Sequence, residues 1–236
     1  MDATMSGVMV TELAELARTA AKELEDAPAE AILRWAAETF GDRLCVTSSM
    51  TDAVLPHLAS RAKPGIDVLF LETGYHFTET LGTRDAVAAI YPVNVVNVRP
   101  QQTVAEQDAT LRPRLYERNP DLCCRLRKVQ PLNKALEPYL AWASGIRRDE
   151  SDTRRTTRVV EWDARRRKIK VNPLARWTQE DVDNYIEEHG ILVNPMVYDG
   201  YPSIGCAPCT RQVAAGDDPR SGRWAGQGKT ECGIHQ

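Results

Sequence analysis

Apolar and polar positions alternate along the chain with two periods, one typical of helices and the other of strands. Residues 10–25 place apolar side chains on one helical face, and residues 28–40 repeat that pattern up to Gly41, a residue suited to a helix C-cap. Four short apolar runs follow, at residues 43–47, 66–71, 93–98 and 140–144. Because helical stretches separate these runs, the order predicts a doubly wound, mostly parallel α/β sheet with helices on both faces.

Polar turns follow three of these apolar runs. They occupy residues 48–52, 72–74 and 145–155. In a parallel sheet the carboxyl ends of the strands lie along one edge, and ligands bind in the crevice beyond that edge. We therefore expect these three turns to contribute to one binding site.

The last third of the chain is less regular. Short strands are predicted at residues 159–163 and 169–171, and Thr178 is a suitable N-cap for a helix that ends at Gly190. Beyond Ile191 the chain is rich in proline and glycine. We expect a single domain with three parts: N-terminal helices over residues 1–41, an α/β core over 42–205 and a C-terminal extension over 206–236.

Composition and charge exclude several classes of protein. Of the 236 residues 42% are hydrophobic and 27% are charged, which is ordinary for a globular protein. The formal net charge of −3 argues against binding to nucleic acid or to an anionic membrane. No apolar run approaches the ~20 residues of a membrane span. The first ten residues lack the pattern of a signal peptide, so we expect a cytoplasmic protein.

The cysteines form a pattern typical of a metal centre. Two of the six are adjacent, Cys123 and Cys124, and two more form the Cys-x-x-Cys pair Cys206 and Cys209. Four thiolates can hold one tetrahedral zinc ion or one [4Fe–4S] cluster. Adjacent side chains diverge, which favours a cluster because it offers iron atoms at separate corners. Zinc, disulfides and plain buried thiols remain alternatives.

Basic residues are concentrated near the expected site. Lys128 follows Cys124 by one helical turn, where a cation would offset the charge of the thiolates, and Arg127 is either a second such cation or part of a solvated face. Nine basic residues lie between positions 145 and 168, and Arg220 and Arg223 follow in the extension. Arginine side chains at a strand end suit phosphate or sulfate oxygens, whereas residues 165–168 are expected to form an exposed loop.

Cys232 lies near the end of a glycine-rich tail. We expect this tail to be mobile and exposed, so that a thiolate there attacks a substrate and is then resolved by a partner protein. The alternative is an incidental frayed terminus. His235 either tunes this thiol or belongs to a disordered end, and Cys45, inside a predicted strand, is expected to be a packed core thiol.

Together these features resemble the sulfonucleotide reductases, in particular the iron–sulfur branch that reduces adenylyl sulfate (APS). The resemblance covers residues 45–235. It rests on four features: Cys123-Cys124 with Cys206 and Cys209, the run Leu71-Glu72-Thr73-Gly74, the arginine-rich segment after Gly145, and the terminal Glu231-Cys232-Gly233-Ile234-His235. It implies an adenine nucleotide α-hydrolase-like α/β fold and a place in sulfate assimilation and cysteine biosynthesis.

The resemblance also implies a mechanism and roles for individual residues. The Cys232 thiolate would attack the sulfur of APS and expel AMP, and thioredoxin would release sulfite from the S-sulfocysteine. Cys123, Cys124, Cys206 and Cys209 would hold a [4Fe–4S] cluster with a structural and electrostatic role. The implied substrate-binding residues are Ser48, Ser49 and Asp52 on the phosphate side, Leu71, Glu72, Thr73 and Gly74 by the adenosine, and Lys128, Arg147, Arg154, Arg220 and Arg223 around the phosphosulfate. Arg148 and Arg155 are alternatives to their neighbours.

Two departures from the family pattern and two competing functions stay open. The loop over residues 48–52 lacks the glycines that ATP pyrophosphatases of the same fold use, and Glu72 stands where the family more often has aspartate. A 3′-phosphorylated substrate (PAPS) is the close rival, disfavoured by the four cysteines. A zinc module that binds RNA through the arginine-rich stretch is the alternative from another class. The oligomeric state is left open, with a homo-oligomer compatible with the sequence.

Overall fold

The computed structural model of the chain describes residues 3–235. Its centre is a six-stranded sheet with the order β3-β2-β1-β4-β6-β5. The strands are β1 (Leu44–Thr47), β2 (Ile66–Leu71), β3 (Val93–Val98), β4 (Ala141–Ser144), β5 (Val160–Asp163) and β6 (Lys168–Val171). All neighbouring pairs are parallel except β5 and β6, which form an antiparallel hairpin at one edge. The predicted mostly parallel, doubly wound sheet is confirmed.

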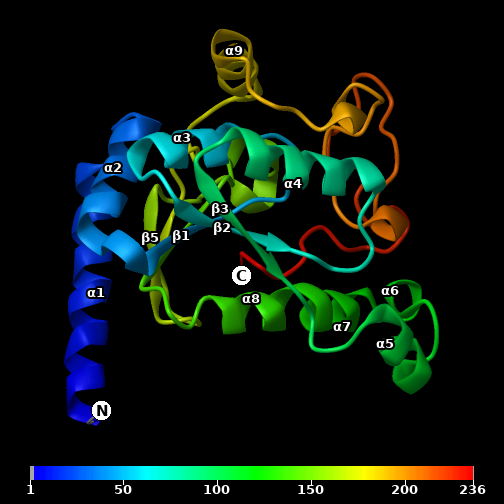
Figure 1. Cartoon of the computed structure of the whole chain (residues 1–236), viewed down its shortest axis with the longest axis horizontal. Coiled ribbons are helices and arrows are strands. Elements are labelled where there is room, and N and C mark those ends of the chain that lie inside the picture. Colours follow the sequence, from blue (N-terminus) through cyan, green and yellow to red (C-terminus); the bar gives the residue numbers. More distant parts are fainter. Residues whose placement is uncertain (1–2, 236) are drawn as a thin grey trace.

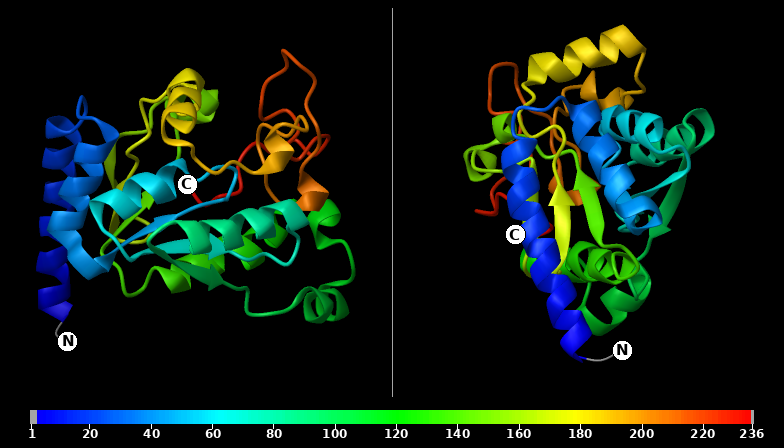
Figure 2. Two further views of the ribbon diagram at one scale, coloured as in Figure 1. Left: turned by 45° about the horizontal axis from the view of Figure 1, so that its top comes forward. Right: turned by 90° about the vertical axis from the view of Figure 1, so that its left-hand side faces the viewer.

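Helices cover both faces of this sheet (Figure 1). The helices are α1 (Ala3–Glu23), α2 (Ala29–Phe40), α3 (Val54–Ala62), α4 (Thr78–Ile90), α5 (Val104–Leu111), α6 (Leu115–Arg118), α7 (Pro120–Cys124), α8 (Gln130–Ala135) and α9 (Gln179–His189). Helices α2, α3 and α4 lie on one face and α7 and α8 on the other, while α1 packs against β5 and β6. Figure 2 shows this edge position of α1 from two further directions; in its left view, residues 200–220 lie at the opposite end of the sheet and the tail after them returns toward the middle.

The two-residue period of the strands builds a separate core on each face. In β1, Leu44 and Val46 join the larger core with α2 and α3, whereas Cys45 points to the other side. In β4, Trp142 is fully buried in the smaller core, together with Leu132 of α8. This alternation is the geometry of a strand with both faces covered, and it confirms Cys45 as a packed core thiol.

The outer parts of the chain dock on this core. Leu13 and Ala17 of α1 and Ile32 of α2 are buried in the larger cluster. Residues 1–2 of the predicted N-terminal part and residue 236 of the predicted extension lie outside the described residues. Within residues 3–235, no helix is both long enough and apolar enough to cross a membrane.

Candidate active site

A cavity of about 570 Å³ opens at the carboxyl ends of the parallel strands. This is the edge at which ligands bind in open α/β sheets, and the volume is in the range of small-molecule sites. Its walls come from the turn after β1, the turn after β2, the segment after β4 and the C-terminal extension. The predicted residues that line it are Ser48, Ser49, Asp52, Leu71, Thr73, Lys128, Arg147, Arg154, Cys206, Arg220, Arg223 and Cys232.

The turn after β1 wraps tightly although it contains no glycine. Met50 adopts a left-handed backbone conformation with φ 61° and is fully buried. Its amide donates to Ser48 Oγ at 3.2 Å, and its carbonyl accepts from Asn194 Nδ2 at 3.1 Å. Asp52 Oδ1 accepts from the amide of Val54 at 3.0 Å at the start of α3. Burial raises the pKa of Asp52. Met50 and its two hydrogen bonds therefore supply the bend that related loops obtain from glycine.

Only some residues of the turn after β2 face the cavity. Leu71 and Thr73 line the cavity, but Glu72 and Gly74 do not. Glu72 Oε1 accepts from the amide of Gly74 at 2.9 Å, and Glu72 Oε2 pairs with Arg84 at 3.3 Å. Glu72 and Gly74 thus shape the turn, and a direct role of either residue at the adenosine stays a prediction.

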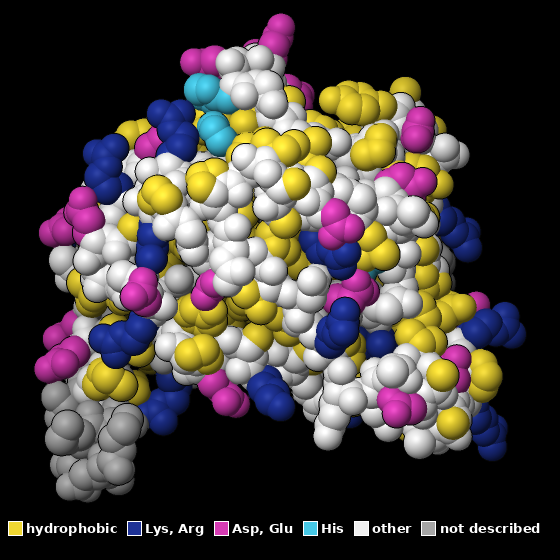
Figure 3. All heavy atoms as spheres, in the orientation of Figure 1, with side chains coloured by type: hydrophobic (Ala, Val, Ile, Leu, Met, Phe, Trp, Pro, Cys, Tyr) yellow, Lys and Arg dark blue, Asp and Glu magenta, His cyan; other side chains and the backbone are white. Residues whose placement is uncertain are grey.

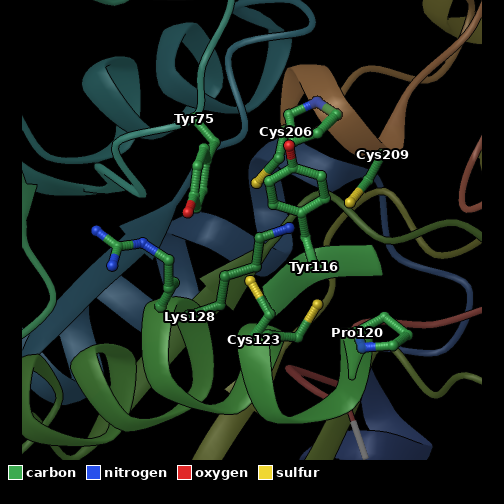
Figure 4. A pocket seen from close by; sticks show the side chains of 10 residues that line it. Tyr75, Tyr116, Pro120, Cys123, Lys128, Cys206 and Cys209 are labelled. Atoms are coloured by element: carbon green, nitrogen blue, oxygen red, sulfur yellow. The ribbon is translucent and has the colours of Figure 1, made fainter. Parts of the chain in front are cut away.

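The four predicted ligand cysteines face one small pocket beside this cavity (Figure 4). Cys123 and Cys124 end α7, while Cys206 precedes the 3₁₀ turn Ala207–Cys209 and Cys209 ends it. All four are buried and none forms a disulfide. Burial, reinforced by the other three cysteines, raises the pKa of Cys123 to about 12, and burial raises that of Cys209 to about 11. Bare thiols at Cys123 and Cys209 would therefore resist ionisation.

Local sequence explains how α7 presents its cysteines. Asn119 caps the helix by accepting from the amide of Leu122 at 2.9 Å, and Pro120 occupies the first turn. The segment Arg125–Val129 is π-helical. Pro131 has no amide hydrogen for the carbonyl four residues earlier, which accounts for the wider turn. Single π turns of this kind are frequent at functional sites.

Two basic side chains follow the cysteine pair, and both are buried. Arg127 donates to the carbonyl of Thr73 and, at 3.1 Å, to Gln107 Oε1, so it ties the turn after β2 to α5 rather than forming a solvated face. Lys128 lines both the cysteine pocket and the larger cavity. Burial alone would lower the pKa of Lys128, but the nearby cysteines, Cys206 foremost, raise it above its usual value. Lys128 is therefore a cation shared by the two sites.

The structure separates the arginine pairs that the sequence left open. Arg147 and Arg154 line the cavity. Arg148 instead pairs with Glu25 at 2.7 Å, and Arg155 is exposed and pairs with Asp152. In the extension, Arg223 donates to the carbonyl of Ile204 at 3.2 Å and lies over the ring of Trp224.

The C-terminal tail is packed into the cavity, contrary to the expected mobile and exposed tail. Glu231, Cys232, Ile234 and His235 line the cavity, and Cys232 is half-buried. Ile234 packs against the smaller core, and the His235 ring stacks on Trp142 with a centroid separation of 6.0 Å. Burial lowers the pKa of His235 well below its usual value. The apolar socket beside Trp142 explains the difference, because it buries residues that composition alone marks as a frayed end.

Residues 43–212 match the family model described as the phosphoadenosine phosphosulfate reductase domain. The chain belongs to this family. The sulfonucleotide reductase resemblance is thereby confirmed at family level.

Among solved structures, phosphoadenylyl-sulfate (PAPS) reductase from Candida auris, a phosphate complex, is similar with a TM-score of 0.71 and 29% identity, over 84% of this chain and 97% of that one. Candida glabrata FMN adenylyltransferase, at a TM-score of 0.54 and 12% identity over 84% of this chain and 71% of that one, shares the fold.

Curated relatives extend the match to nearly the whole chain. An adenosine 5'-phosphosulfate reductase from Streptomyces coelicolor is 65% identical over 95% of this chain and 95% of its own length. Proteins of the same name from Mycolicibacterium smegmatis and Rhodococcus opacus are 59% and 52% identical, the first over 95% of both chains and the second over 100% of this chain and 99% of its own.

Two contacts at the site escaped sequence reasoning. Thr73 was expected by the adenosine, but its Oγ1 lies 3.3 Å from Cys206 Sγ, so it also contacts the cysteine pocket. Glu231 was noted only as part of the terminal motif, yet it binds Arg154 at 2.7 Å. Hydrogen bonds from Arg154 outweigh burial and lower the pKa of Glu231. Sequence offered no signal for this contact, because its partners are 77 positions apart.

Proposed function

We propose that the chain is a thioredoxin-dependent oxidoreductase that reduces adenylyl sulfate to sulfite and AMP in sulfate assimilation. The observation that carries this proposal is the position of the half-buried Cys232, in a cavity that is also lined by Lys128, Arg147 and Arg223. Such a site combines a nucleophile with cations for an anionic substrate. The names of the relatives at 52–65% identity support the same substrate.

The reaction proceeds as two displacement steps at Cys232. Its thiolate attacks the sulfur of adenylyl sulfate, the sulfur–oxygen bond to the phosphate breaks, and AMP leaves with that electron pair. A thioredoxin thiolate then attacks Cys232 Sγ, and sulfite leaves with the electrons of the sulfur–sulfur bond. The second thioredoxin thiol resolves the mixed disulfide and regenerates Cys232. The two electrons that reduce the sulfur therefore come from the thioredoxin dithiol.

The residues at the cavity fall into three groups toward this substrate. Ser48, Ser49 and Asp52 are proposed to bind on the phosphate side, and the turn over residues 71–74 to contact the adenosine. Lys128, Arg147, Arg220 and Arg223 are proposed to surround the phosphosulfate. Arg154 lines the same cavity, but carboxylates already occupy its guanidinium.

The four buried cysteines fit a [4Fe–4S] cluster. They are unpaired thiols facing one pocket, with a buried cation, Lys128, beside them. A bound cluster would turn the four thiols into thiolate ligands and place a charged group beside the substrate cavity. We propose Cys123, Cys124, Cys206 and Cys209 as its ligands.

The rival functions have less support. PAPS is the substrate named for the Candida auris structure, but that protein is only 29% identical to this chain. An RNA-binding zinc module would need a continuous basic surface. Figure 3 instead shows acidic and basic side chains interspersed on the face it presents.

The proposal is tested on protein purified without oxygen. We expect about four iron atoms and four sulfides per chain, as a single [4Fe–4S] cluster requires. Mixed with adenylyl sulfate alone, the wild type should gain the mass of one sulfonate, and thioredoxin should then release sulfite. The Cys232→Ser variant should bind the nucleotide but form no adduct. Normal turnover by that variant would remove Cys232 as the nucleophile, and a zinc-containing protein that turns over PAPS only would refute the assignment.

A further inference from the structure

Side-chain contacts, not backbone pairing, hold the tail that carries Cys232. In the described part of the chain, no backbone–backbone hydrogen bond involves residues 228–235. Polar contacts hold it instead. Glu231 accepts from Arg154 and Thr153 and lies 3.4 Å from Arg220, Arg220 also donates to the carbonyl of Thr230, and Lys229 pairs with Asp121. A segment without a hydrogen-bonded ladder can detach when a few contacts break.

The pair between Arg154 and Glu231 is the best-formed of these contacts. Arg154 Nε lies 2.7 Å from Glu231 Oε1, and Nη2 lies 2.8 Å from Oε2, so the pair is bidentate. Both side chains are only 10% exposed. Bidentate arginine–carboxylate pairs with little solvent access are among the strong polar contacts in proteins.

The remaining Arg154 nitrogen is also occupied by a carboxylate. Nη1 lies 2.5 Å from Glu150 Oε2, and the same oxygen accepts from the amide of Arg147 at 2.9 Å. Glu150 therefore orients Arg154 from the wall of the cavity while Glu231 approaches from the tail. The guanidinium has no free edge for a substrate anion.

Three other cations of the cavity have no carboxylate partner among the described residues. Lys128, Arg147 and Arg223 form no ion pair with any described residue. The Nε atoms of Arg147 and Arg223 are buried without a hydrogen-bond partner. These cations remain available to an incoming anion, whereas Arg154 is committed to the tail.

Resting on the proposed reductase function, we propose that Arg154 and Glu231 form a latch that positions the Cys232 thiol at the substrate. Glu231 directly precedes Cys232, so fixing its carboxylate restrains the thiol at the next residue. Both latch residues are positioning residues, because they act through Cys232. Opening the latch frees the S-sulfonated tail to meet thioredoxin, in the manner of lids that open for the second half of a reaction.

This assignment predicts that variants of the latch bind the nucleotide normally but transfer the sulfonate group more slowly. Arg154 and Arg220 balance the charges of Glu150 and Glu231 in the closed arrangement, so opening the latch changes the position of the thiol more than the affinity of the cavity for a nucleotide. In Glu231→Gln, iodoacetamide should alkylate Cys232 about tenfold faster, and the first-order rate of sulfonate transfer from adenylyl sulfate should fall about tenfold. The dissociation constant of AMP should stay within about twofold. Glu231→Asp, which keeps the charge, should recover part of the transfer rate.

Two matched variants separate the latch from a general loosening of the tail. Asp121→Asn removes the one ion pair of the described tail that does not involve Glu231, in which Asp121 is 83% exposed, and should leave the alkylation and transfer rates within about twofold. Arg154→Gln should act like Glu231→Gln, and the double variant should be no worse than either alone. All rates are measured on the anaerobically purified protein by intact mass, with Cys232→Ser as the blank.

The proposal is overturned if Glu231→Gln alkylates at the wild-type rate, or if Arg154→Gln weakens AMP binding while Glu231→Gln does not. The second result would return Arg154 to the substrate. A wild-type protein that binds AMP but forms no sulfonate adduct would refute the reductase function instead, and the alkylation rates would still decide whether the latch exists.

Discussion

At the scale of single residues, Gly74 is required by its surroundings. Its φ is 76°, and a Cβ atom there would lie 2.9 Å from Val104 Cγ2 and 3.2 Å from Arg127 Nη2. We expect Gly74→Ala to lower the free energy of unfolding by about 1–3 kcal/mol, through backbone strain and this overlap. Urea unfolding of the anaerobic protein measures the change.

Gly82 is the matched control. It lies inside α4, and a Cβ atom there would meet nothing within 4 Å. Gly82→Ala should therefore raise the free energy of unfolding by about 0.5–1 kcal/mol. A Gly74→Ala protein as stable as the wild type would show that the turn after β2 adjusts without cost.

Residue types in the sequence indicated the chemistry of the site but not its internal contacts. The cysteine pattern located the pocket, because the type and spacing of the cysteines alone indicate metal ligands. The choice between Arg147 and Arg148 needed coordinates. The two arginines are neighbours in sequence, and they differ only in where their side chains lie, Arg147 in the cavity and Arg148 beside Glu25. The loop with Met50 shows a further limit, because a left-handed non-glycine residue is fixed by a distant partner, Asn194.

At the scale of elements, the start of α9 depends on a reciprocal cap. Thr178 Oγ1 accepts from the amide of Asp181 at 3.1 Å, and Asp181 Oδ2 accepts from the amide of Thr178 at 2.7 Å. We expect Thr178→Ala to lower the free energy of unfolding by about 1 kcal/mol in denaturant titration. Thr39→Ala, at an exposed threonine inside α2, should change it by less than about 0.5 kcal/mol. Equal effects of the two substitutions would contradict a capping role.

Elements with strong periodicity were predicted closely, and those set by tertiary context were not. Strands β2 and β3 have the predicted bounds, because each is a six-residue apolar run between clear turn signals. The antiparallel direction of β5 was missed, since a strand's own residues do not encode its direction. The π turn Arg125–Val129 was missed as well, although Pro131 marks the place.

At the scale of the whole molecule, the contact between α3 and α9 should make stability depend on pH. His57 Nδ1 lies 2.9 Å from Tyr185 Oη, and the His57 and His189 rings are 5.6 Å apart. Burial, and then the charges of His189 and Arg61, lower the pKa of His57 below 6.5. The folded state then binds fewer protons than the unfolded state, so this contribution is complete above pH 6.5 and is lost as the pH falls through the folded-state pKa.

Melting temperatures measured between about pH 5 and 8 test this dependence. The His57→Gln variant retains a side chain that can bond Tyr185 but does not titrate. We expect a shallower loss of melting temperature on acidification in that variant than in the wild type. Parallel curves for the two proteins would mean that His57 does not contribute to the pH dependence.

The cluster proposal makes a prediction about how the two halves of the site hold together. Cys123 and Cys124 belong to α7, whereas Cys206 and Cys209 belong to the extension, so a bound cluster would close a long loop across the molecule. We expect its removal by oxidation and chelation to speed hydrogen exchange in residues 120–129 and 204–224. Exchange in β1 and β2 should change little, because their strand pairing and apolar cores are independent of the four ligand cysteines.

Hydrogen exchange measured by mass spectrometry on the protein with and without the cluster decides between these cases. Uniform loss of protection would mean that the cluster sustains the whole fold, and unchanged protection near the cysteines would mean that the four thiols do not hold the group.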